Sequence, residues 1–176
     1  MGKIMGARAQ MFTADLTHNG SGNRGQIIIR SQAIQQSNEA VKMEIRLQNV
    51  NNVTGGCAGM CSEPQNYHLQ IQKNVPGTDN FVTCFRHERS FRDRNPNLGP
   101  SFNVHMTALC NGNPDARIRF ALVGQNGQSF NYFESTVNQI RGGQMTLDGH
   151  AGTTLIFNRF EIFIQPTFVD YLRSGW

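Results

Sequence analysis

The sequence predicts an all-β fold, an eight-stranded antiparallel β-sandwich. The clearest observation is residues 41–48, where four apolar side chains alternate with four polar ones. A period of two over this length places every apolar side chain on one face of a strand, whereas a helix would scatter them. Turn residues recur at short spacing, and no segment keeps a helical period. These features are typical of a sandwich or a barrel, and a viral jelly roll or an immunoglobulin-like domain fits the same pattern.

Several segments have strand character, and clusters of Gly, Pro, Asn and Asp separate most of them. The expected strands are residues 26–30, 41–50, 67–72, 81–91, 102–106, 118–122, 130–137 and 153–165. Residues 1–24 are polar and end in a Gly-rich run. They are therefore expected to be an N-terminal lead-in segment, and residues 25–176 are expected to be the folded domain.

Length and charge exclude several classes of protein. A chain of 176 residues is long enough for one domain with its own core. The net charge of +4 is modest, and no run of like charges resembles a nucleic-acid-binding arm, so nucleic acid is not an expected partner. No apolar stretch approaches the roughly 18 residues of a membrane span, and the N-terminus lacks the apolar core of a signal peptide. A cytoplasmic protein is therefore expected.

The reactive side chains form no recognisable catalytic or metal-binding pattern. Cys57 and Cys61 are spaced as in a metal clip or a local disulfide, but no His or second Cys pair nearby completes a tetrahedral site. All four cysteines, including Cys84 and Cys110, are expected to be free thiols, like most cysteines of cytoplasmic proteins. The histidines are scattered along the sequence. No catalytic residue and no cofactor is therefore expected, and the protein is predicted not to be an enzyme.

Several short motifs narrow the choice of fold. They are Asn-Pro-Asn-Leu at residues 95–98, Phe-Asn-Val at 102–104, Ala-Leu-Cys-Asn-Gly at 108–112, Phe-Glu-Ile at 160–162 and the closing run at 167–175. Together they resemble the second C2 domain of the copine family, which precedes a von Willebrand A-type domain. The Gly-Lys-Ile-Met-Gly run at residues 2–6, with Arg8, is similar to the copine stretch between the two C2 domains.

The resemblance implies a β-sandwich of the C2-domain type that ends at the junction to an A-type domain. It also implies that this chain is one domain of a longer protein, with a tandem C2 domain before it and the A-type domain after it. These neighbouring domains are then expected partners. A peripheral membrane protein that binds anionic phospholipid or a partner protein is expected from such a domain.

Successive connections of an antiparallel sandwich alternate between its two ends. The loops at about residues 49–66, 93–100 and 123–129 are therefore expected at one end, and those at 75–80 and 109–116 at the other. In C2 domains calcium binds at the first of these ends, through aspartates on its first and third loops.

The loops at the end where C2 domains bind calcium lack most of the acidic residues that the family has there. Residues 123–129 contain no acidic residue, where copines usually have an Asp-x-Asp-x-Asp-Gly run. Glu63 replaces the family's Asp in the first loop, Asp93 flanks the second, and Asn126 lies in the third. Calcium takes about six to eight oxygens, several of them from carboxylates. These degenerate positions are therefore not expected to hold calcium.

Basic side chains crowd the segment that enters the Asn-Pro turn. They are Arg86, His87, Arg89, Arg92 and Arg94. C2 domains often carry a basic cluster on this strand that binds anionic lipid headgroups, and a guanidinium suits phosphate because it donates two parallel hydrogen bonds. The alternative is a solvated strand face that Glu88 and Asp93 partly neutralise.

Three hypotheses about function follow. The leading one is a non-catalytic, calcium-independent C2 domain of a copine-like protein, which docks on protein partners or on an anionic phospholipid membrane. The second is a calcium-dependent phospholipid-binding C2 domain with ligands from Glu63, Asp93 and backbone carbonyls. The third is an unrelated jelly-roll protein with a structural role, which self-assembles.

Overall fold

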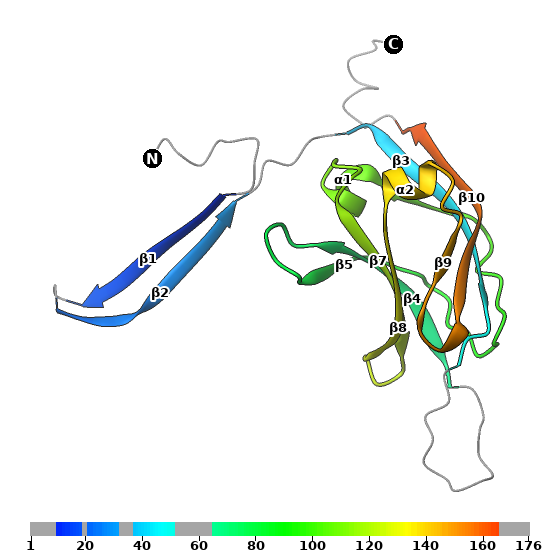
Figure 1. Cartoon of the computed structure of the whole chain (residues 1–176), viewed down its shortest axis with the longest axis horizontal. Coiled ribbons are helices and arrows are strands. Elements are labelled where there is room, and N and C mark those ends of the chain that lie inside the picture. Colours follow the sequence, from blue (N-terminus) through cyan, green and yellow to red (C-terminus); the bar gives the residue numbers. More distant parts are fainter. Residues whose placement is uncertain (1–9, 19–20, 32–36, 52–64, 166–176) are drawn as a thin grey trace, which may run out of the picture. The chain divides into compact units, whose positions relative to one another are not determined.

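The computed structural model describes residues 10–18, 21–31, 37–51 and 65–165. The chain divides into two compact units. Among the described residues the first unit holds two strands, and the second holds eight strands and three short helices (Figure 1).

The second unit consists of two four-stranded sheets. The strand order in one sheet is β6 (Phe102–His105), β3 (Glu39–Gln48), β10 (Thr154–Ile164), β9 (Thr146–Asp148). The order in the other is β5 (Phe81–Arg86), β4 (Tyr67–Asn74), β7 (Arg117–Gly124), β8 (Ser129–Thr136). Every pairing in both sheets is antiparallel. The expected eight-stranded antiparallel sandwich is confirmed.

The core lies between the sheets and is built from the alternating side chains. On β3, Met43 and Ile45 are fully buried, while the intervening side chains are partly or wholly exposed. Phe120 on β7 comes from the other sheet, and its ring meets that of Phe157 on β10 edge-on, with centroids 5.3 Å apart. Each sheet therefore buries one face, since removing apolar surface from water is the main favourable term in folding.

Three one-turn helices connect strands: α1 (Met106–Cys110), α2 (Val137–Arg141) and the 3-10 helix η1 (His150–Gly152). Thr136 caps α2, because its side chain accepts a hydrogen bond from the Gln139 backbone N–H at 3.1 Å. The Gln139 side chain in turn accepts one from the Thr136 backbone N–H at 3.0 Å. This capping box ends β8 and begins the helix.

The expected strand at residues 81–91 is shorter in the structure. β5 ends at Arg86, and a single isolated bridge joins Phe91 to Tyr67 beyond it. The register of β5 against β4 shifts between Thr83 and Phe85. The alternation of side chains that the sequence suggests is therefore interrupted before the basic segment begins.

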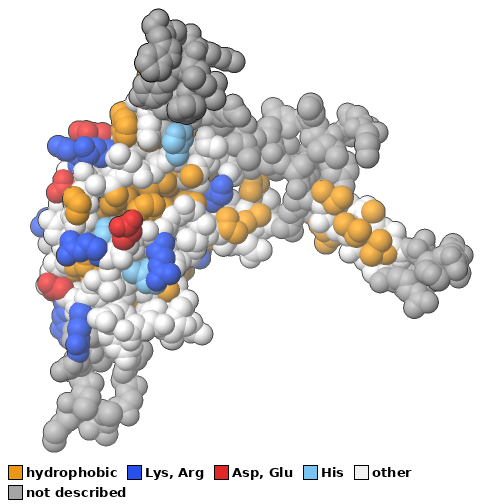
Figure 2. Space-filling view, turned by 180° about the vertical axis from the view of Figure 1, so that it is seen from behind, with side chains coloured by type: hydrophobic (Ala, Val, Ile, Leu, Met, Phe, Trp, Pro, Cys, Tyr) orange, Lys and Arg blue, Asp and Glu red, His pale blue; other side chains and the backbone are white. Residues whose placement is uncertain are grey.

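The first unit is a hairpin of β1 (Gln10–His18) and β2 (Ser21–Ser31). The strand expected at residues 26–30 is part of β2, and β9 is the additional strand that completes the sandwich. The compact unit that contains the sandwich starts at Gln35 rather than at residue 25. Ile27, Ile28 and Ile29 are 44%, 56% and 50% exposed, and Figure 2 shows apolar side chains gathered on this hairpin.

Contacts between described loop residues occur at both ends of the sandwich. At one end, the Val50 N–H donates to the Arg94 carbonyl at 2.9 Å. At the other end, the Asn138 amide donates to the Asp115 carboxylate at 2.7 Å. In the described part of the chain, no helix has both the length and the apolar character needed to cross a bilayer.

Candidate functional site

The positions expected for a degenerate calcium site are only partly described. Glu63 lies outside the described residues, as do Cys57 and Cys61. The Asp93 carboxylate accepts a hydrogen bond from the Asn95 N–H at 2.9 Å, and the Asn126 side-chain oxygen accepts one from the Gln128 N–H at 3.0 Å. Both oxygens therefore stabilise the turns of their own loops. Within the described ranges, no group of three or more His, Cys, Asp or Glu side chains could hold a metal ion.

His87 differs from the other members of the expected basic cluster. It is only 6% exposed, and its ring packs against those of Phe91 and Phe102 at centroid distances of 5.4 Å. Its Nδ1 accepts a hydrogen bond from the Arg89 N–H at 3.2 Å, and its Nε2 lies 3.3 Å from the Leu98 carbonyl oxygen. His87 therefore holds the segment after β5 in place and is not available to a ligand.

The four arginines of the cluster are exposed. Arg89 donates to the Gly99 carbonyl at 2.9 Å and lies over the Phe91 ring at 5.8 Å. Arg92 and Arg94 lie on the following loop, and the backbone carbonyl of Arg94 is bonded to Val50. These contacts anchor the backbone of the loop and leave charged groups at its surface.

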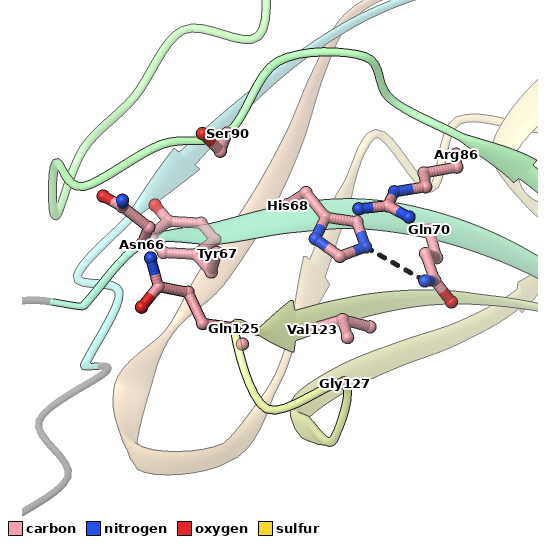
Figure 3. Close-up of a pocket in the computed structure, with 10 residues that line it drawn as sticks. Asn66, Tyr67, His68, Gln70, Arg86, Ser90, Val123, Gln125 and Gly127 are labelled. Atoms are coloured by element: carbon pink, nitrogen blue, oxygen red, sulfur yellow. Dashed lines mark hydrogen bonds between the residues drawn. The ribbon is translucent and has the colours of Figure 1, made fainter.

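Of the four arginines, Arg86 alone lines a hollow on the outer face of the β5-β4-β7-β8 sheet (Figure 3). The hollow has a volume of about 580 Å³. Its lining residues come from β4, the end of β5 and the turn between β7 and β8, and they are Asn66, Tyr67, His68, Gln70, Arg86, Ser90, Val123, Gly124, Gln125 and Gly127. No carboxylate is among them.

His68 and Gln70 form the floor of this hollow. Both project from the outer face of β4, because positions 67, 69 and 71 face the core. Gln70 and His68 share a hydrogen bond of 3.0 Å, drawn in Figure 3, and Gln70 also accepts one from the Thr83 hydroxyl at 3.0 Å. Because Thr83 takes the amide oxygen, the amide nitrogen is the donor to His68 Nε2.

The charge of the hollow depends on two side chains, His68 and Arg86. Burial lowers the pKa of His68, and repulsion from the nearby Arg86 guanidinium lowers it further. The lowered pKa favours the neutral imidazole at pH 7, and Arg86 supplies the one permanent positive charge among the described lining residues. Within the described part of the chain, Arg86 makes no ion pair with a carboxylate.

A second hollow on the same sheet face has a different balance of charge. It is lined by acidic and basic side chains together, including Asp79, Arg117, Arg119 and Glu134. Glu134 bonds to Arg117 at 2.8 Å and to Arg119 at 2.6 Å. The guanidinium of Arg119 also lies 3.9 Å from the centroid of the Phe81 ring. The positive charge of Arg119 is therefore already neutralised by a carboxylate of the protein.

The sequence identified Arg86 but missed the other residues of the first hollow. The alternation in residues 67–72 places His68 and Gln70 on one face. It does not reveal that this face lies beside Arg86, since the register of β4 against β5 and β7 is fixed by tertiary pairing. Gln125 was visible only as part of a turn.

Comparison with known proteins adds a similarity of fold. No family model matches the chain, and no curated protein matches it. Among solved structures, the chain is similar to one titled "BON1-C2B", with 13% sequence identity and a TM-score of 0.49. The match covers 72% of this chain and 92% of that one. At this level of identity the likeness concerns the path of the chain, and no ligand or partner follows from it.

Proposed function

We propose that this chain is a non-catalytic, C2-type binding domain that docks on anionic phospholipid membranes without calcium. The observation that carries the proposal is the hollow around Arg86, whose described lining residues include a guanidinium and no carboxylate. A guanidinium binds phosphate oxygens through two parallel hydrogen bonds. A cation with no internal carboxylate partner can do so without first breaking an ion pair.

The other exposed arginines support a membrane contact at the same end of the sandwich. Arg89, Arg92 and Arg94 follow Arg86 along the chain and lie towards the same end of the sandwich. Each basic residue near an anionic membrane surface contributes about 1 kcal/mol. A few arginines at one end are therefore enough for reversible peripheral binding. The proposal omits His87, because it is buried.

The chemistry of the described loop residues supports a membrane contact that does not require calcium. Asn126 offers a neutral amide oxygen, and the Asp93 carboxylate is bonded to the backbone of its own turn. Neutral oxygens recover little of the hydration energy that a doubly charged ion loses. The proposed membrane contact is instead made by arginines, in a peripheral and cytoplasmic protein.

Vesicle sedimentation tests the proposal. The protein should sediment with vesicles that contain phosphatidylglycerol and stay in solution with pure phosphatidylcholine, equally in calcium and in a chelator. The triple variant with Arg86, Arg89 and Arg92 changed to Ala should lose about 100-fold in affinity, at about 1 kcal/mol for each charge. Arg141→Ala is the matched control, because Arg141 is exposed on α2 at the other end of the sandwich.

Other outcomes select the alternatives. Binding only in calcium would support a calcium-dependent domain. Failure to bind any anionic vesicle would refute the membrane role and favour a protein partner. Concentration-dependent growth into large oligomers in light scattering would favour a self-assembling jelly-roll protein.

A further inference from the structure

The lining of the Arg86 hollow differs from a simple basic patch. Besides Arg86 it contains amide and hydroxyl side chains, those of Asn66, Ser90 and Gln125. Figure 3 shows the amides of Asn66 and Gln125 close to each other at one end of the hollow and Arg86 at the other, beside His68. In the described part of the chain, the side chains of Asn66, Ser90 and Gln125 make no hydrogen bond to the protein.

We infer that this hollow selects a singly charged phosphodiester on a hydroxyl-rich lipid headgroup, such as inositol or glycerol. The inference rests on the proposed membrane function and specifies its ligand. In this arrangement the Arg86 guanidinium binds the phosphate, and the amides of Asn66 and Gln125 bind the hydroxyl groups. A volume of about 580 Å³ lies within the range of roughly 300–1,000 Å³ that is usual for small-ligand sites.

The count of charges argues against headgroups with several phosphates. One guanidinium balances one phosphodiester, and the described lining residues include no second permanent cation. Each additional phosphate would be desolvated beside amides and a neutral imidazole. Neutral donors can hydrogen-bond to an anion, but they bring no opposite charge to balance it, so the hollow gives extra phosphates no further charge attraction.

The absence of carboxylates among the described lining residues argues against amine-bearing headgroups. Serine, ethanolamine and choline each place a cation within a few bonds of the phosphate. In this hollow that cation would meet Arg86 and no carboxylate. An aromatic face is a usual substitute for a carboxylate, but Tyr67 is 1% exposed and its hydroxyl donates to the Asp93 carbonyl. A bound amine would therefore be repelled without compensation.

Amide side chains suit hydroxyl groups because each amide carries both a donor and an acceptor. A hydroxyl group also donates and accepts, so it can satisfy either end of the amide. The side chains of Asn66 and Gln125 lose contact with water when a ligand enters, and a headgroup without hydroxyls would leave them unpaired. A polar group that loses its water without gaining a partner weakens binding, which is the physical basis of the selectivity.

The test compares vesicles of equal surface charge that contain phosphatidylinositol, phosphatidylglycerol, phosphatidylserine or phosphatidylinositol 4,5-bisphosphate. The two hydroxyl-rich monoanionic lipids should bind about threefold to tenfold more tightly than phosphatidylserine, the effect of one or two hydrogen bonds. The bisphosphate should give no gain at matched charge. Equal binding of all four lipids, or the tightest binding to the bisphosphate, would overturn the inference.

Two variants separate headgroup selection from charge attraction. Gln125→Ala should remove the preference for phosphatidylinositol and leave the binding of phosphatidylserine unchanged. Gln128→Ala is the matched control, because Gln128 is an exposed glutamine of the same turn that does not line the hollow. An identical effect of the two variants would refute a role for the Gln125 amide.

A soluble probe separates the failure of the inference from the failure of the membrane function. Glycerophosphoinositol should shift the side-chain amide resonances of Asn66 and Gln125 in NMR spectra, and glycerophosphoserine should not. If no anionic vesicle binds but these shifts occur, the membrane function is wrong and the headgroup selectivity stands. If anionic vesicles bind and neither soluble headgroup shifts these resonances, the membrane function stands and the selectivity is wrong.

Discussion

Replacing Tyr67 with Phe removes one hydroxyl group that connects β4 to the loop carrying the exposed arginines. The Tyr67 side chain is 1% exposed, and its hydroxyl donates to the Asp93 carbonyl at 2.7 Å. Burial and the neighbouring Asp93 raise the pKa of Tyr67 above its ordinary value, so the hydroxyl remains a donor throughout the neutral range. The ring contacts, including the edge-on contact with Phe130 at 5.7 Å, are kept by Phe.

The cost of Tyr67→Phe follows from what happens to the freed carbonyl. Asp93 is exposed, so water can replace the lost donor, and the full penalty for an unpaired buried group does not apply. The expected loss is about 1 kcal/mol of unfolding free energy, the usual value of a neutral hydrogen bond. For a domain of this size, that corresponds to a fall of about 4 °C in Tm.

Thermal denaturation followed by circular dichroism measures this difference. Tyr132→Phe is the matched control, because Tyr132 is 39% exposed and its hydroxyl makes no hydrogen bond in the described part of the chain. Its Tm should stay within about 1 °C of the parent, as expected for a surface substitution. Equal falls in Tm for the two variants, or no fall for Tyr67→Phe, would refute the structural role of this hydroxyl.

Three further predictions concern charge. The pKa of His68 should lie below its ordinary 6.5 in an NMR titration and should rise in Arg86→Gln. The contribution of His68 to the free energy of unfolding should be lost as the pH falls from 6.5 towards that lower pKa, because in this range the unfolded chain binds the proton more tightly than the folded chain does. Glu134→Gln should cost no more than about 1 kcal/mol in urea denaturation, because its ion pairs with Arg117 and Arg119 are partly solvated. Millimolar calcium should change Tm by less than about 1 °C, whereas calcium at about 100 times its Kd would add about 2.7 kcal/mol.

The strands that bury one face could be predicted from the sequence. In β3 and β4 each apolar side chain that alternates with a polar one is buried. The period of two therefore predicts which side chains face the core. The short helices were not predicted, because five residues are too few to display a helical period. The capping box of Thr136 and Gln139 was nevertheless present in the sequence as Thr-x-x-Gln, and this signal could have located the start of α2.

The basic segment shows where alternation stops being informative. Arg86 and His87 are adjacent, and the sequence assigned both to a lipid-binding cluster. The register of β5 against β4 shifts between Thr83 and Phe85, and β5 ends at Arg86. His87 then turns inward to pack against Phe102. A bulge depends on the pairing with the neighbouring strand, so its position could not be derived from the residues of β5 alone.

The two arginine-containing hollows of one sheet face show why the number of basic residues is a poor guide to binding. Arg119 bonds to Glu134 and lies against the Phe81 ring, so a phosphate would have to displace a carboxylate that is already in place. Arg86 lies on the same face with neutral amides and an imidazole as its neighbours in the hollow. The attraction between two charges depends inversely on their separation and on the local dielectric, so an internal carboxylate at 2.6 Å outcompetes an external phosphate. Net charge cannot distinguish these two arginines, and only the position of Glu134 relative to each of them decides which guanidinium remains available to a ligand.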